Sequence, residues 1–220
     1  MSGSRGRVGR IRQQHEGTIL KAAEHVFARS GFQGATMAEI ALRAGMPKSN
    51  LHYYFGTKVE VYRAVLAHIL ELWLAETDRF TPDADPREAL SHYIEAKMRL
   101  TAERPDASRV FANELLHGAP EIGDYLRGAL RALVADKSVV IRGWIAAGRM
   151  AAVDPEHLFF SLWALTQTYA DFETQVGAVL GRSNLGPADY RRATDHVLNL
   201  VLRGCGLMPP AAIEEPPCST

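Results

Sequence analysis

The sequence predicts an all-α protein with a small N-terminal three-helix domain and a larger C-terminal helical bundle. Apolar residues recur at three- and four-residue spacing along most of the chain, which is typical of amphipathic helices. Capping residues, glycines and prolines divide these segments into helices of ordinary length. No segment shows the apolar–polar alternation of a half-buried strand. These three observations together predict the fold class.

The charges of the chain are unevenly distributed. The 220 residues carry no net charge, but residues 1–65 hold ten Lys and Arg against four Asp and Glu, whereas residues 66–220 hold fifteen against twenty-one. A basic segment on a mildly acidic body suggests a polyanionic partner for the first segment. A chance imbalance explains the counts equally well, so charge alone does not decide whether this segment binds a nucleic acid.

Cysteine content and hydropathy bear on the compartment. Cys205 and Cys218 are the two cysteines, too few for a disulfide framework or a metal cluster, and this favours a reducing compartment. No apolar region follows the basic segment Met1–Arg12 as it would in a secretory signal, and no apolar run approaches the roughly 18 residues of a membrane span. We therefore expect a soluble, cytoplasmic protein without metal or cofactor.

The N-terminal third divides into an arm and three helices. Residues 1–13 are rich in Gly, Ser and Arg, so we expect a flexible basic arm. Thr36 and Glu39 have the spacing of a capping box, which places the start of the second helix. The predicted helices cover Gln14–Ser30, which Gly31 ends, Thr36 to about Ala44, and Pro47 to about Tyr54.

Six further helices are predicted after Gly56. Their expected ranges are 58–79, 86–103, 105–117, 121–148, 155–181 and 187–204. Prolines and glycines lie in the breaks between them, and four prolines after Met208 predict a disordered tail. The domains expected are thus 14–60, 61–206 and the tail 207–220.

The second and third helices match a helix-turn-helix. They are joined by Ala44-Gly45-Met46, in which Gly45 can take the positive φ that a sharp turn between helices needs. The motif in general is moderately specific, because helix-turn-helix shapes also serve as plain structure.

The residues around this motif resemble the DNA-binding region of the TetR family over roughly residues 16–66. The resemblance rests on Phe32-Gln33-Gly34-Ala35-Thr36, Ile40-Ala41, Ala44-Gly45, Leu51, Tyr54-Phe55 and Lys58. It implies that the third helix lies in the major groove of operator DNA. By position, the expected base readers are Lys48, Ser49, Asn50 and His52. The expected phosphate contacts are Thr36, Tyr53, Tyr54 and Lys58.

Some of these residues have alternative interpretations. His52 stands where the family usually has tyrosine, and Pro47 where it usually has a capping serine. Tyr53 or Tyr54 could instead pack half-buried against the fourth helix, and the lysines could be ordinary solvated charges. The arginines of the arm could add phosphate or minor-groove contacts or have no role. These are Arg5, Arg7, Arg10 and Arg12.

The segment Phe159–Phe172 suggests a ligand site in the body. Trp163 and Gln167 are four residues apart and so share one helical face. An indole plane beside a primary amide can stack on a flat heterocycle and pair with its edge. Alternatively, the tryptophan belongs to the core, and the amide satisfies a buried backbone group or lies at an interface between subunits.

A closer similarity covers most of residues 16–175. The stretches 105–120 and 137–172 resemble the Rut-type regulators of pyrimidine utilisation within that family. This implies a pocket for an effector such as uracil or thymine. The residues expected to line it are Trp73, Trp163, Gln167 and Tyr169, with Lys97, Ser108 and Phe111 as further candidates. Asn113 and His117 depart from the pattern and could face the pocket, so a different small metabolite is an alternative.

We expect a homodimeric repressor on a palindromic operator. One helix-turn-helix reads few base pairs, so specificity calls for two copies, paired through the apolar faces of Leu158–Val179 and Tyr190–Leu202. If both helices are internal, the chain is monomeric instead. We find no HExxH, GxSxG, P-loop or GxGxxG motif in a suitable setting and expect no enzyme. A helical protein-interaction module without DNA binding is the alternative from another class.

Overall fold

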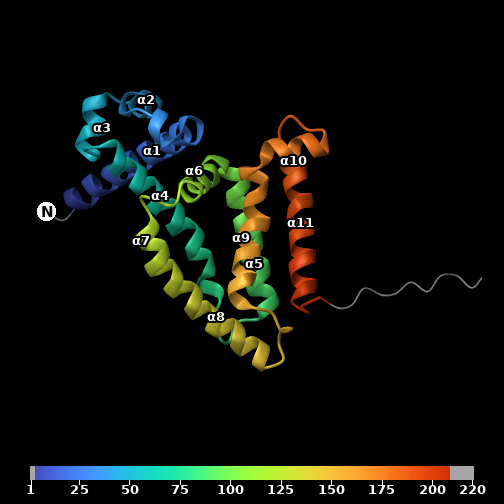
Figure 1. Ribbon diagram of the computed structural model, residues 1–220. Helices are drawn as coiled ribbons and strands as arrows, with labels where there is room; N and C mark the ends of the chain where they lie inside the picture. The colour runs from blue at the N-terminus through green and yellow to red at the C-terminus, as the bar shows by residue number, and fades with distance from the viewer. Residues whose placement is uncertain (1–2, 209–220) are drawn as a thin grey trace, which may run out of the picture.

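The computed structural model describes the backbone of residues 3–208 and the side chains of residues 14–208. Every regular element in this range is helical, which confirms the predicted fold class. Helices α1 to α3 form a small head at one end, and the longer helices form the body (Figure 1). The side chains of the predicted arm and the tail beyond residue 208 lie outside the described residues.

Helix α1 runs over Gly3–Gly34 and is kinked at Gly31, whose φ is 64°. The kink falls where the first helix was predicted to end. At its other end the helix begins at Gly3, so the backbone of residues 3–13 is helical where the sequence predicts a flexible arm. Arg and Gln are good helix formers, and an existing helix is extended at little cost once its nucleus has formed.

Helices α2, Met37–Arg43, and α3, Lys48–Tyr54, form the predicted helix-turn-helix. Thr36 and Glu39 make the expected capping box at the start of α2. Gly45 has a φ of 67°, which a residue with a Cβ adopts only under strain. The sharp turn between the two helices therefore has the local chemistry that the sequence indicates.

The body begins without a linker. Helix α4, Lys58–Ala75, is capped by Thr57 and continues into a 3₁₀ turn, Glu76–Arg79. Four further helices begin with proline, whose fixed φ suits the first turn. They are α5, Pro86–Glu103, α6, Pro105–Leu116, α9, Pro155–Asp171, and α11, Pro187–Gly204. Helices α5, α9 and α11 lie side by side (Figure 1).

Two of the predicted helices are interrupted. The range 121–148 contains α7, Gly123–Tyr125, a π-helical turn, Leu126–Leu130, and α8, Arg131–Ala146. The range 155–181 breaks at Phe172, and α10, Glu173–Leu180, follows. Arg109 of α6 donates to the carbonyl of Ala170 (3.2 Å) and pairs with Glu173. These tertiary contacts hold the break, and helical periodicity in the sequence does not reveal them.

The core of the head continues into the body. Ile19, Ile40 and Leu51 of the head belong to one buried cluster with Val110 and Phe111 of α6. A displacement of α6 therefore acts on the head through direct packing. Within residues 3–208 no helix is both long and apolar enough to cross a membrane.

Candidate functional sites

Helix α3 lies at the outer edge of the head (Figure 1) and exposes the residues predicted to read bases. These are Lys48, Ser49, Asn50 and His52. Leu51, between them, is fully buried and anchors the helix to the core. The first turn of α3 therefore offers an ammonium, a hydroxyl and a carboxamide to a partner.

His52 has a defined tautomer in its neutral form. Its Nδ1 lies 3.1 Å from the carbonyl oxygen of Gly56. Because a carbonyl oxygen only accepts, Nδ1 carries the proton, and Nε2 is left as an acceptor. The neutral ring can therefore accept from a base amino group, as on cytosine or adenine.

The two tyrosines that follow have different surroundings. Tyr53 is 74% exposed, whereas Tyr54 is half-buried against the core of the head. Their rings meet edge to face with centroids 5.4 Å apart, and the ring of His15 lies 6.1 Å from that of Tyr54. The packing interpretation therefore applies to Tyr54, and Tyr53 is free to reach a phosphate.

Lys58 and Thr36 are engaged within the head. The Lys58 ammonium donates to the carbonyls of Phe32 (2.7 Å), Gln33 (3.3 Å) and Ala35 (2.9 Å). An ammonium has three N–H groups, and here all three are directed to these carbonyls, so the phosphate contact of Lys58 stays a prediction that requires one of these bonds to be exchanged. The cation closes the end of α1, where free carbonyls favour positive charge. The Thr36 side chain is exposed, but its hydroxyl bonds to Glu39 (2.9 Å) in the capping box.

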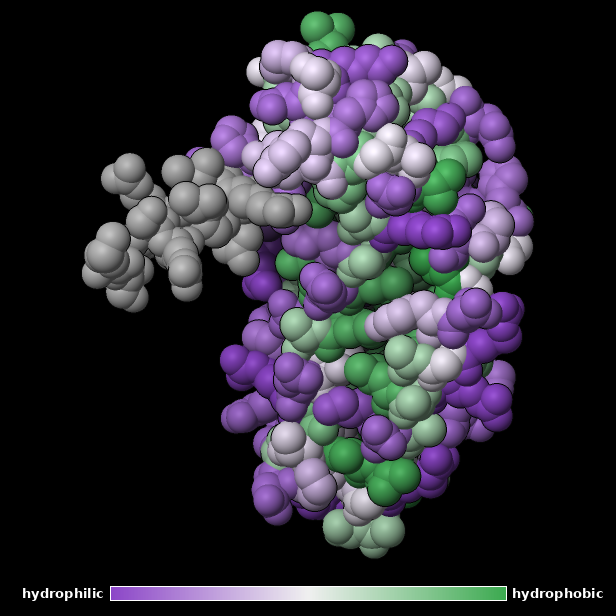
Figure 2. Space-filling view, turned by 90° about the vertical axis from the view of Figure 1, so that its left-hand side faces the viewer, coloured by the Kyte–Doolittle hydropathy of each residue, from purple (hydrophilic) through white to green (hydrophobic). Residues whose placement is uncertain are grey.

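A cavity of about 260 Å³ lies in the body, where α4, α5, α6, α9 and the π-helical turn meet. It brings together five of the residues predicted to bind the effector, namely Trp73, Lys97, Phe111, Trp163 and Gln167. Its volume is slightly below that of typical sites for drug-sized ligands, so it suits a single-ring molecule. On the face where α4 and α8 lie, hydrophobic side chains gather in a hollow (Figure 2).

The polar groups of the cavity are few. Trp163 Nε1 donates to the hydroxyl oxygen of Tyr93 (2.9 Å), and Lys97 Nζ lies 3.6 Å from the ring centroid of Trp73. The Gln167 amide has no hydrogen-bond partner among the described residues. Burial lowers the pKa of Lys97 to about 7, although the negative charge of Asp171 acts to raise it. The cavity thus combines aromatic planes with an amide and a buried amine.

Four other candidates lie outside this cavity. Tyr169, two residues beyond Gln167, faces the opposite side of α9 and packs beside Tyr190. Ser108 is buried, and its hydroxyl donates to Asp171 (2.6 Å between Oγ and Oδ1). Asn113 and His117 line a separate hollow against the head. The expectation that any of these lines the effector cavity is therefore corrected.

Several residues that line the cavity were not predicted from the sequence. Tyr93 precedes Lys97 by one helical turn, so helical spacing could have identified it. Leu126 and Leu130 also line the cavity, and they belong to the π-helical turn. Such turns are common at functional sites, but no residue pattern in the sequence predicts this one.

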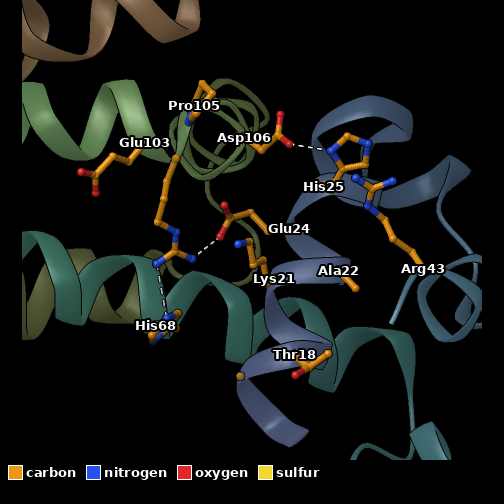
Figure 3. A pocket seen from close by; sticks show the side chains of 12 residues that line it. Thr18, Lys21, Ala22, Glu24, His25, Arg43, His68, Glu103, Pro105 and Asp106 are labelled. Atoms are coloured by element: carbon orange, nitrogen blue, oxygen red, sulfur yellow. Dashed lines mark hydrogen bonds and ion pairs between the residues drawn. The ribbon is translucent and has the colours of Figure 1, made fainter. Parts of the chain in front are cut away.

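A cleft of about 870 Å³ with many polar side chains lies between the head and the body, beside their shared core (Figure 3). His25 of α1 and Asp106 of α6 lie across it from each other, 2.7 Å apart at Nδ1 and Oδ2. Arg104 pairs with the buried carboxylate of Glu24 and lies 3.4 Å from His68. Burial raises the pKa of Glu24, although Arg104 opposes the shift. Burial and the Arg104 charge both lower the pKa of His68.

Helix α6 therefore contacts both the head and the cavity region. Asp106 faces α1, and Phe111 lines the cavity. Ser108 bonds to Asp171 on α9, and Arg109 joins Asp106 (3.4 Å) to Glu173. Burial also raises the pKa of Asp171. A continuous set of polar contacts thus leads from α9 through α6 to α1.

Comparison with known proteins yields family matches to two adjacent segments of the chain. The family described as bacterial regulatory proteins, tetR family, matches residues 19–65, and the YcdC-like protein, C-terminal region, matches residues 66–208. The HTH-type transcriptional regulator RutR of Escherichia coli K12 is 42% identical over 186 residues, which are 84% of this chain and 88% of RutR.

Solved structures show the same fold. The TetR family transcriptional regulator PfmR of Thermus thermophilus matches with a TM-score of 0.67 at 19% identity, over 84% of this chain and 97% of PfmR. AibR, in complex with isovaleryl coenzyme A and operator DNA, matches with a TM-score of 0.65 at 17% identity, over 84% of this chain and 97% of AibR.

Proposed function

This chain belongs to the TetR family and is a ligand-responsive transcription regulator, and we propose that its effector is a small flat heterocycle of the pyrimidine type, such as uracil or thymine. The observation that carries the proposal is the cavity in which Trp73, Trp163 and Gln167 meet. The two indole rings offer stacking surfaces. The amide can give one hydrogen bond and accept another, which matches the adjacent N–H and C=O of a pyrimidine imide.

On the DNA side, we infer that α3 reads the major groove through Lys48, Ser49, Asn50 and His52. Their exposure supports this assignment, as does the family's helix-turn-helix geometry. Tyr53 and the backbone at the start of α2 supply phosphate contacts, which set the register of the head. A regulator of this kind acts on chromosomal DNA in the cytoplasm and needs no catalytic activity.

Assembly is part of the same proposal. Phe160 of α9, Val179 of α10 and Leu200 of α11 are large apolar side chains that the single chain leaves exposed. A two-fold partner that offers the same surface would cover them. The resulting homodimer would present two copies of α3 to the half-sites of a palindromic operator.

The proposed switch runs through α6. An effector in the cavity contacts Phe111, and α6 also carries Asp106, which faces His25 of α1. If the effector favours an arrangement in which the two heads no longer match the half-site spacing, operator affinity falls and repression is relieved. A hundredfold loss requires about 2.7 kcal/mol of coupling between the two sites.

The decisive experiment measures effector binding and operator release together. A thermal-shift panel of uracil, thymine and their breakdown products identifies ligands, because a ligand bound to the folded state raises the melting temperature. Fluorescence anisotropy with DNA from the promoter of the gene that encodes this chain then measures how far each ligand releases the DNA from the protein. Gln167→Ala is expected to keep its DNA affinity and to lose effector binding, whereas Gln175→Ala, exposed on α10, keeps both. Full effector response in Gln167→Ala would overturn the assignment of the cavity.

A further inference from the structure

The effector cavity supplies more hydrogen-bond donors than acceptors. Lys97 carries up to three N–H groups, and Tyr93, whose oxygen already accepts from Trp163, has its own proton to donate. Gln167 contributes the carboxamide oxygen as an acceptor. The remaining lining is aliphatic or aromatic. A complementary ligand must therefore bring several acceptor atoms.

Lys97 is the charged group of the cavity, and few groups of the described residues interact with its ammonium. Its side chain is 1% exposed, and its Nζ makes no hydrogen bond to any described residue. Its Nζ lies 3.6 Å from the ring centroid of Trp73, within range of a cation–π interaction. Asp171 acts on it through charge, but that carboxylate is bonded to Ser108 and forms no ion pair with Lys97 in the described part of the chain.

A buried ammonium of this kind is costly unless an anion or several acceptors surround it. The other groups lining the cavity are uncharged, and Asp171 acts on the ammonium from outside this lining, so within the cavity only the ligand can bring a negative charge. A cationic ligand would be repelled by the ammonium. A neutral ring would bring no negative charge to the ammonium in this low-dielectric site.

Resting on the proposed function, we propose that Lys97 is the counter-ion of the effector, so that the cavity takes an acidic flat heterocycle, bound as its anion, in preference to a neutral one. The ammonium donates to the negative oxygen while Gln167 pairs with the neighbouring edge. The required chemistry is a negative oxygen on a planar ring. It can arise from an ionised ring imide or from a carboxylate on the ring.

The test is calorimetry on the full chain with three ligands of similar size. Uracil is neutral near pH 7.5, 5-nitrouracil has a far more acidic ring N–H because the nitro group withdraws electrons, and orotate carries a carboxylate. Lys97→Met keeps the length of the side chain without its charge. Lys137→Met, a half-buried lysine of α8 outside the cavity, is the matched control.

We expect the wild type and Lys137→Met to bind one of the anionic ligands on the order of 10- to 100-fold more tightly than uracil. Which of the two binds distinguishes an imide from a carboxylate. Lys97→Met is expected to lose this preference.

A second measurement needs no variant. The Lys97 amine is largely neutral at pH 8 and largely protonated at pH 6, because its pKa is about 7. Binding of the anion to the wild type should therefore be coupled to uptake of a proton by Lys97 at pH 8 and to no uptake at pH 6. Calorimetry in buffers of different ionisation enthalpy measures this uptake.

The failures are distinguishable. If the wild type binds uracil as tightly as the anionic ligands, with the same ratio in Lys97→Met and no proton uptake, the counter-ion assignment is wrong and the pyrimidine effector stands. If none of the three ligands binds the wild type, the proposed function fails as well.

Discussion

At the scale of single residues, the same residue type has opposite roles at two positions of the head. Lys48 is exposed at the start of α3, where its ammonium is available to DNA. Lys58 directs its ammonium to three backbone carbonyls near the end of α1 and lies 4.6 Å from the ring centroid of Phe32. Lys58 therefore stabilises the head, although the family pattern suggests a phosphate contact.

This difference predicts two distinct phenotypes. Lys58→Met leaves carbonyls of Phe32 and Ala35 without their donor, so unfolding free energy should fall by about 1–3 kcal/mol. Lys48→Met should leave stability unchanged and weaken operator binding by roughly 1–3 kcal/mol, since it removes a direct contact to DNA. Urea denaturation and anisotropy titration at fixed salt measure the two effects. Equal stability of both variants would show that the Lys58 contacts are worth little.

At the scale of elements, α6 joins the effector cavity to the head. Phe111 faces the cavity, Ser108 is bonded to α9, and Asp106 lies against His25 of α1. Beside this contact, the buried carboxylate of Glu24 is compensated by Arg104. Because buried charges tolerate little separation from their partners, a shift of α6 changes the energy of the whole head–body contact.

Asp106→Asn tests this element without removing packing volume. The substitution weakens the contact with His25, so the ratio of operator affinities without and with effector should fall by roughly fivefold, about 1 kcal/mol of coupling. Affinity for the effector itself should change little. Asp124→Asn, at an exposed carboxylate paired with Arg127, is the control. The ratio is obtained from paired anisotropy titrations, and an unchanged ratio in Asp106→Asn would exclude this route.

At the scale of the whole molecule, one chain leaves large apolar side chains uncovered on α9, α10 and α11. Phe160 and Leu200 are each 51% exposed on α9 and α11, the two helices predicted to pair with a second subunit. Such residues are costly on a monomer when they gather on one surface. Their position supports a dimer in which both heads bind DNA together.

The double variant Phe160→Glu, Leu200→Glu should therefore be monomeric at micromolar concentrations, because two like charges would face their copies across the interface. Loss of the second head should weaken operator binding by about 100-fold or more. Val139→Glu, at an exposed apolar site on α8, should remain dimeric. Light scattering after size exclusion reports the mass, and a dimeric double variant would place the interface elsewhere.

The sequence by itself determined the features that depend on local chemistry. The capping box of Thr36 and Glu39, the turn at Gly45 and the prolines that open the long helices act over a few residues, so the residue types are enough to predict them. Helical spacing likewise placed Trp163 and Gln167 on one face, and both line the cavity.

Tertiary structure alone decided the features that join distant segments. The break at Phe172 depends on Arg109, and the π-helical turn brings Leu126 and Leu130 to a cavity shared with α4 and α5. Lys58 bonds to α1 because packing brings the carbonyls within its reach. Contacts between residues far apart in the chain depend on packing across the whole fold, and the pattern of a single segment carries no record of them.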